Sequence, residues 1–158
     1  MTLWGRYEHA GKAGFGTIAG DTVAVHKGNI FKNPKATGET LSLADVKLLM
    51  PSAPTKMVAL WNNFHALAAK MEMPEPDEPL YLLKANNSFF GPGETIHRPK
   101  SYDGKVVYEG ELGIVIGKQC KNVSEKDAPG YIFGYTCIND VTAAELISKD
   151  KTFAQWVR

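Results

Sequence analysis

Two glutamates lie two residues apart in an apolar segment of the chain, Glu109 and Glu111 within residues 106–117. Alternating apolar residues predict a strand there, and side chains alternate between the two faces of a strand. Both carboxylates therefore point the same way, with their side-chain origins roughly 6 to 7 Å apart. Like charges that close raise each other's pKa unless a cation or a basic residue lies between them. A divalent ion is one way to resolve that conflict.

A third carboxylate, Asp140, follows the next predicted strand, residues 131–138. The carboxyl ends of strands are common ligand sites in α/β sheets. Three carboxylates without a Cys or His partner favour Mg²⁺ or Mn²⁺ over zinc, and they leave coordination positions for water and a chelating substrate. The alternative from these residues alone is a solvated strand face, with Lys105 and Lys118 available as ion-pair partners.

The composition is that of a globular protein of about one domain. The chain has 158 residues, of which 44% are hydrophobic and 22% charged, close to the average for soluble domains. A formal charge of +1 argues against a nucleic-acid partner. No apolar run approaches the roughly 20 residues of a membrane helix, so we expect a cytoplasmic protein with no membrane partner. Cys120 and Cys137 match neither a disulfide framework nor a zinc motif, which predicts two buried thiols.

The N-terminal third of the chain predicts a small β-rich lobe, residues 1–55. Short strands are expected at residues 3–8, 15–19, 22–26 and 29–31, with turns at residues 20–21 and 27–29, where Gly and Asn tolerate positive φ. A short helical turn is expected at residues 43–50. The segment from Pro51 to Pro54 can continue neither a helix nor a central strand, and it marks the boundary of the lobe.

Residues 56–158 alternate between strand and helix patterns, which predicts a mixed, β-rich α+β domain. Strands are expected at residues 57–60 and 80–84, with a helix at residues 61–71 between them. Residues 73–79 and 86–99 carry Pro and Gly and are expected to be loops. Asn139 and Asp140 should end the strand before them, and Thr142 with Glu145 has the spacing of a capping box at the start of a helix.

Two segments carry a specific resemblance to a known family. The sequence YEGELGIVIGK at residues 108–118 and the sequence GYTCINDVTA at residues 134–143 resemble the fumarylacetoacetate hydrolase family. Gly91-Pro92-Gly93 and residues 153–156 match as well, so the similarity extends over nearly the whole chain. Within the family, the chain resembles the 2-hydroxyhepta-2,4-diene-1,7-dioate and 5-carboxymethyl-2-hydroxymuconate isomerase group. The resemblance implies a rolled mixed β-sheet catalytic domain behind a small N-terminal lobe.

The resemblance also implies a site and a chemistry. By it, Glu109, Glu111 and Asp140 are the ligands of one Mg²⁺ or Mn²⁺, and His65, in WNNFHA, is the proton-transfer group. Lys84 matches a lysine near the substrate pocket, although a solvated strand end is an equal reading of it. Family members hydrolyse, decarboxylate or isomerise small 2-oxo or 1,3-dioxo carboxylic acids in aromatic or sugar-acid catabolism, and they are commonly homodimers. A metal chelated by such an acid stabilises its enolate.

The chain departs from the family at several positions. Ala68 stands where many members have a glutamate that pairs with the histidine, and Glu72 is the substitute that the sequence suggests. Ala144 and Ile147 replace an Arg and a Gln. The sequence ends at Arg158, before a family lysine and roughly another hundred residues, so we expect the N-terminal part of a longer protein. Two hypotheses follow: a metal-dependent enzyme, or an inactive family fragment that serves as a binding or assembly module.

Overall fold

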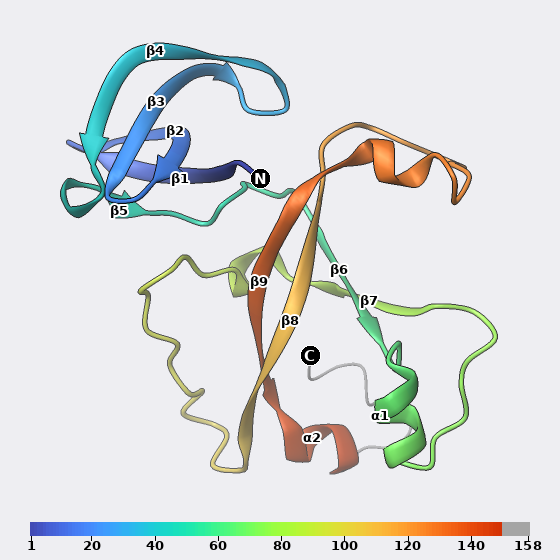
Figure 1. The fold of residues 1–158 in the computed structure, drawn as a ribbon. Coiled ribbons are helices and arrows are strands. Elements are labelled where there is room, and N and C mark those ends of the chain that lie inside the picture. Colours follow the sequence, from blue (N-terminus) through green and yellow to red (C-terminus); the bar gives the residue numbers. More distant parts are fainter. Residues whose placement is uncertain (150–158) are drawn as a thin grey trace. The chain divides into compact units, whose positions relative to one another are not determined.

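The computed structural model describes residues 1–149 of the chain, and its N-terminal part is a five-stranded antiparallel sheet (Figure 1). The strands are β1 (Leu3–His9), β2 (Lys12–Ala19), β3 (Thr22–Asn29), β4 (Lys32–Ser42) and β5 (Lys47–Leu48), in the order β4-β3-β2-β1-β5. Ala10 and Gly11 connect β1 to β2 with φ values of 48° and 74°, which is the two-residue turn that suits the twist of a hairpin. The predicted β-rich lobe is present.

Three details of the lobe differ from the prediction. The strand expected at residues 29–31 is absent there, and the fourth strand is β4, from Lys32 to Ser42. Residues 27–29 lie inside β3, and the turn follows at Ile30 and Phe31, where the Asn29 side-chain oxygen accepts a hydrogen bond from the Phe31 amide at 2.8 Å. Residues 43–50 form a short 3₁₀ turn, η1 (Leu43–Asp45), and then β5 rather than a helix. Pairing with β1 along Tyr7 and Glu8 provides backbone hydrogen bonds that a marginal helical turn does not.

The core of the sheet is small and centres on Tyr7 and Val23, which are 5% and 0% exposed. Tyr7 pairs across β1 and β2 with Gly14, and a Cβ atom on Gly14 would lie 2.7 Å from the phenol ring. Glycine is therefore required for the ring to lie over the sheet. Burial raises the pKa of the Tyr7 phenol, and the charge of Glu39 raises it further.

The raised pKa of Tyr7 predicts a loss of stability at alkaline pH. The unfolded chain ionises this phenol at its ordinary pKa of 10.0, whereas the folded chain holds the proton to higher pH. The stability that Tyr7 contributes through its raised pKa is thus complete below about pH 10, and it is lost as the pH rises through the pKa of the phenol in the folded chain. Tyr7→Phe should flatten this fall in the free energy of unfolding, measured by urea titration. Tyr81→Phe, at a phenol that is 72% exposed, should leave it unchanged; an equal effect of both variants contradicts the prediction.

A second pair of strands, β6 (Met57–Trp61) and β7 (Leu80–Lys84), is antiparallel and flanks the helix α1 (His65–Lys70). Both strands match their predicted ranges to within one residue. The helix is shorter than predicted, because Asn62 has a positive φ of 52° that breaks the helical path. A short 3₁₀ turn, η2 (Asn86–Ser88), follows β7 and starts the long loop.

The strands β8 (Val106–Ile116) and β9 (Ile132–Ala143) pair with each other, and the segment that connects them ends in the 3₁₀ turn η3 (Ala128–Tyr131). Contrary to the prediction, β9 continues through Asn139 and Asp140. Thr142 is buried in that strand, at 4% exposure, and does not cap the following helix α2 (Ala144–Lys149). The first amides of α2, those of residues 144 and 145, donate instead to the Lys105 carbonyl and the Tyr102 hydroxyl.

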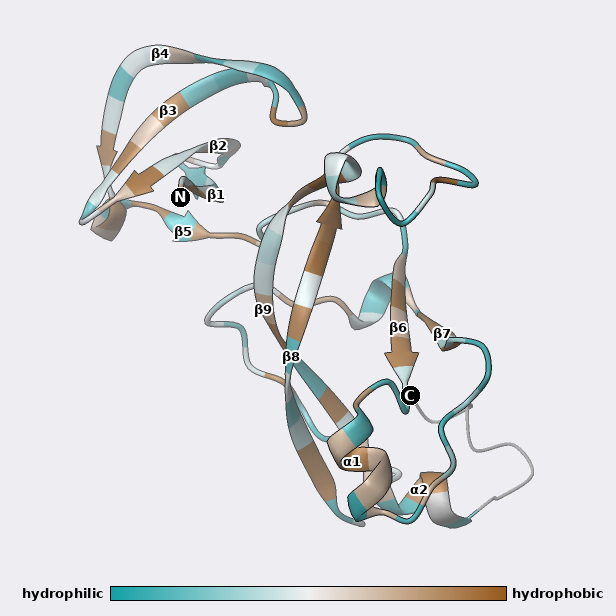
Figure 2. Cartoon of the chain, turned by 45° about the vertical axis from the view of Figure 1, so that its right-hand side comes forward, coloured by the Kyte–Doolittle hydropathy of each residue, from teal (hydrophilic) through white to brown (hydrophobic). Residues whose placement is uncertain are grey.

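Contacts divide the chain into two compact units. Of the residues that the structure describes, the first unit contains residues 1–53, 90–98 and 108–141, and the second contains residues 54–89, 99–107 and 142–149. Much of β6, β7 and β8 is apolar (Figure 2), and many of their side chains are exposed. Among the described residues, the buried apolar side chains are only Tyr7, Val23 and Ala68. None of the helices in residues 1–149 is long and apolar enough to cross a membrane.

Candidate functional site

The three predicted carboxylates lie on one face of the β8–β9 pair. A Cβ atom on Gly113 would lie 2.7 Å from a methyl of Ile138, so this face of β8 meets the Ile138 face of β9. Side chains alternate along strands. Glu111 and Glu109 stand two and four residues before Gly113, and Asp140 stands two residues after Ile138. The first unit therefore gathers all three carboxylates on the same side of the sheet.

The surroundings of the carboxylates differ. Glu111 and Asp140 are half-buried, whereas Glu109 is exposed. Within residues 1–149, no three His, Cys, Asp or Glu side chains lie close enough together to hold an ion. The oxygen donors and their shared face fit a hard divalent cation, but the structure does not bring the three side chains together in a coordination group. The ligand set remains a prediction.

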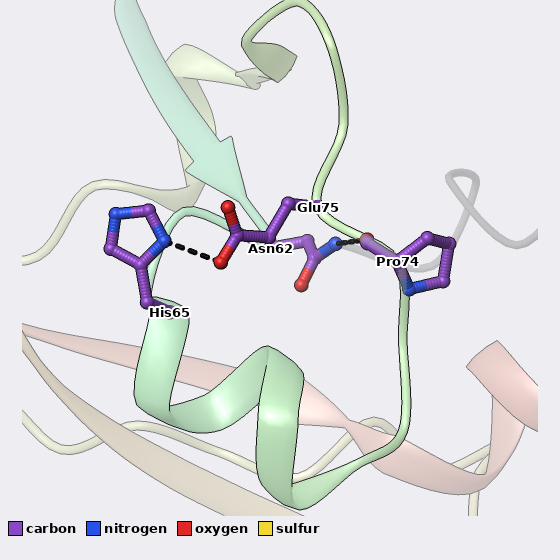
Figure 3. Close-up of polar contacts among 4 residues, drawn as sticks. All are labelled: Asn62, His65, Pro74 and Glu75. Carbon is purple, nitrogen blue, oxygen red and sulfur yellow. Dashed lines mark hydrogen bonds and ion pairs between the residues drawn. The ribbon is translucent and has the colours of Figure 1, made fainter.

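His65 lies in the second unit and forms a close pair with a glutamate (Figure 3). It is the first residue of α1, and its Nδ1 atom lies 2.7 Å from Oε1 of Glu75. The two side chains are 86% and 62% exposed. The carboxylate that meets the histidine is therefore Glu75, not Glu72, because α1 ends at Lys70 and the chain turns at Glu72 with a φ of 54°.

At position 68, many family members have the glutamate that pairs with the histidine, but in this chain the position is buried and unsuited to a carboxylate. Ala68 is 3% exposed, and its backbone amide donates to the Phe64 carbonyl at 3.0 Å. A glutamate there would place a charge in a buried position, which costs free energy unless a partner compensates it. Glu75 lies in the loop after α1 and its side chain stays exposed, so its charge avoids that cost.

Lys84 is the last residue of β7 and is half-buried. It pairs with Met57 across the two-stranded sheet, in the same unit as His65. The predicted site residues thus divide between the two units: the carboxylate face lies in the first, and His65 and Lys84 lie in the second, at opposite ends of the β6–β7 pair.

Two other features, the cysteines and a surface hollow, lie apart from the predicted site residues. Cys120 and Cys137 are exposed, which corrects the prediction of buried thiols; Cys137 faces outward because β9 alternates exposed and half-buried residues. A surface hollow of about 590 Å³ lies at the β8–β9 connection, and Lys118, Lys121, Asn122 and Tyr131 are among its lining residues. Lys118 donates to the Gly130 carbonyl at 2.8 Å, so its ammonium group holds that loop. No predicted site residue lines the hollow.

Comparison with known proteins covers both parts of the chain. Residues 56–158 match the model of the fumarylacetoacetate hydrolase C-terminal family, and residues 3–51 match the Rv2993c-like N-terminal family. An uncharacterized protein of Archaeoglobus fulgidus is 41% identical over 121 residues, which are 77% of this chain and 47% of that protein. The oxaloacetate tautomerase YisK of Bacillus subtilis is 32% identical, over 85% of this chain and 48% of its own. The chain thus spans about half the length of these curated relatives.

Solved structures share the fold. A 5-carboxymethyl-2-hydroxymuconate delta-isomerase from Mycobacterium smegmatis superposes with a TM-score of 0.83 and 36% identity, over 98% of this chain and 61% of that one. The maleylpyruvate hydrolase of Sphingobium sp. SYK-6, in complex with manganese(II) and pyruvate, has a TM-score of 0.69 at 22% identity, over 91% of this chain and 60% of that one. The predicted β-rich fold with its small N-terminal sheet is confirmed, and the chain belongs to the fumarylacetoacetate hydrolase family.

Proposed function

We propose that this chain carries the metal-binding and proton-transfer residues of an enzyme that acts on a small 2-oxo carboxylic acid, by moving a proton or breaking a bond at the carbon next to the 2-oxo group. The observation that carries the proposal is the single face shared by Glu109, Glu111 and Asp140 in a chain of this family. Relatives named as an oxaloacetate tautomerase and a muconate isomerase support the substrate class.

The carboxylates would hold Mg²⁺ or Mn²⁺, since both ions prefer oxygen ligands. A structural relative in complex with manganese(II) supports a divalent ion. When bound, such an ion supplies Lewis-acid stabilisation of the negative charge that develops on the 2-oxo oxygen. The half-buried Glu111 and Asp140 are the ligands least screened by water, so they contribute most of the attraction.

His65 would move the proton, because one ring nitrogen of a neutral imidazole can accept a proton while the other can donate one. Its ring is exposed at the start of α1, where a substrate can reach it. Lys84, half-buried at the end of β7, would pair with a carboxylate of the acid. These roles come from the family positions of the residues.

A second function, a binding or assembly module without turnover, is favoured by two observations. The three carboxylates do not form a coordination group within residues 1–149. Ala144 and Ile147 replace the Arg and Gln of the family. This function predicts neither metal binding nor turnover.

The test is a tautomerisation assay on oxaloacetate and an acylpyruvate. We expect the purified chain to accelerate the decay of the enol absorbance with Mn²⁺ or Mg²⁺ present, and EDTA to abolish the acceleration. Mn²⁺ titration by calorimetry is run on the same sample. Absence of both binding and turnover rejects the enzyme in favour of the module, whereas turnover that survives EDTA rejects the metal's role.

A further inference from the structure

The hydroxyl group of Tyr102 connects the residue before β8 to the start of α2, which follows β9. It donates to the Lys105 carbonyl at 2.8 Å and accepts from the Glu145 amide at 3.3 Å. The Ala144 amide donates to the same Lys105 carbonyl at 3.0 Å. All of these residues belong to the second unit. One side chain thus ties together the two ends of the β8–β9 pair that lie beside α2.

The position of the Tyr102 side chain is fixed by its surroundings. Its backbone amide donates to the Pro99 carbonyl at 3.1 Å, and its side chain is half-buried. A Cβ atom on Gly104 would lie 2.7 Å from the hydroxyl oxygen, so glycine leaves the space that the hydroxyl occupies. The Glu145 amide lies in the first turn of α2, where amides have no partner inside the helix. The hydroxyl supplies that partner.

The backbone bonds at the two ends of the pair show that β8 and β9 are antiparallel. The Ala144 amide meets the Lys105 carbonyl at the α2 end, and the Gly117 amide donates to the Tyr131 carbonyl at 2.8 Å at the other end (Figure 1). In an antiparallel ladder, residues that share such a bond stand directly opposite each other. The bond between residues 105 and 144 therefore defines the register at the α2 end.

This register places two of the three carboxylates opposite each other. Glu109 lies four residues after Lys105, and Asp140 lies four residues before Ala144. Directly opposite residues have Cβ atoms roughly 4.5 to 5.5 Å apart. Like charges at that separation repel unless a cation lies between them. The backbone at this end of the ladder thus decides whether Glu109 and Asp140 face a common ion.

A contact further along the ladder agrees with this register. A Cβ atom on Gly113 would lie 2.8 Å from the methyl group of Thr136, and these two residues stand four further positions inward from Glu109 and Asp140. The register is therefore the same from the α2 end to the middle of the pair. A slip of one residue at that end would turn one of the two carboxylates to the opposite face.

We propose that Tyr102 is a positioning residue for the proposed metal site, whose hydroxyl holds the end of the β8–β9 ladder in the register that sets Glu109 opposite Asp140. The ends of strands open more easily than their centres, and both carboxylates stand four residues from this end. The inference rests on the proposed function, because the alignment matters only if the carboxylates hold an ion. It does not require Tyr102 to touch that ion.

The experiment uses Tyr102→Phe, which keeps the ring and removes both hydrogen bonds of the hydroxyl. Tyr108→Phe is the matched control, at a phenol of β8 that is 83% exposed. The EPR signal of free Mn²⁺ gives the Kd of each variant, and amide hydrogen exchange followed by NMR reads Ala144 and Glu145. Both substitutions are repeated in Glu109→Gln, which removes one member of the opposed pair. This double-mutant cycle separates alignment of the pair from a general loss of stability.

In Tyr102→Phe we expect the amides of Ala144 and Glu145 to exchange about tenfold faster. The Kd for Mn²⁺ should rise about fivefold, the scale of one ordinary hydrogen bond. Tyr108→Phe should change neither quantity. In the Glu109→Gln chain, Tyr102→Phe should change the Kd less than about twofold, because no opposed pair is left to align.

Three results overturn the inference: unchanged exchange in Tyr102→Phe, an unchanged Kd in that variant, or an equal rise of the Kd in the wild-type and Glu109→Gln chains. The last result would mean that the hydroxyl only stabilises the fold. A wild-type chain that binds no Mn²⁺ rejects the proposed metal site together with the inference. A wild-type chain that binds Mn²⁺ no more tightly than Tyr102→Phe rejects the inference alone.

Discussion

Glu111→Gln is expected to weaken Mn²⁺ binding by about 100-fold or more and to lower turnover in proportion. The substitution keeps the size of the side chain and removes one negative charge from a set of three. A neutral amide oxygen is a poorer ligand for a hard divalent ion than a carboxylate, and the loss is larger at a half-buried position, where water screens the charge less. Isothermal titration calorimetry with Mn²⁺ measures the change.

The prediction has a matched control in the same unit. Glu125→Gln removes the same charge from an exposed turn in the β8–β9 connection, outside the carboxylate face, and it should bind Mn²⁺ as the wild-type chain does. Thermal melting of both variants checks that the fold is retained. Equal affinity of Glu111→Gln and the wild-type chain would contradict the assignment of the carboxylate face, whatever the activity.

The strands that the sequence predicts best are those with a continuous apolar run between clear turn residues. The strands β6 and β7 meet this condition, β8 has a clear alternation of apolar residues instead, and the predicted bounds of all three agree with the structure to within one residue. The end of β9 does not. Asn139 and Asp140 have the local preference of a turn, but β8 offers a partner strand and the ladder continues past them. Local preference fails here because the alternative depends on a distant part of the chain.

The candidate site shows the same division. That Glu109 and Glu111 share a face follows from strand alternation alone. Placing Asp140 on that face requires the pairing of β8 with β9, which Gly113 and Ile138 reveal in the structure. The partner of His65 could not be predicted from residue spacing, because Glu75 lies in a loop that has neither helical nor strand periodicity. The two prolines around Glu75 are the signal in the sequence that could have indicated a fixed loop.

His65→Asn is the second substitution with a large expected effect, a fall in kcat of about 100- to 10,000-fold, which is the range for removal of a general acid or base. Asparagine has nearly the reach of the imidazole but does not titrate, so it can keep a contact with Glu75 without accepting a proton. Both side chains are mostly exposed, and the fold should therefore tolerate the change. The kinetics are measured with oxaloacetate at saturating Mn²⁺.

The control for this variant is His97→Asn, at another exposed histidine, in the loop after β7, and it should leave kcat unchanged. Mn²⁺ affinity distinguishes the two large effects. His65→Asn should retain wild-type affinity, because His65 is not among the proposed ligands, whereas Glu111→Gln should lose it. If His65→Asn lost the metal as well, the histidine would act through the ion rather than on the substrate. If it kept both the metal and full turnover, the proton would have to move through another group.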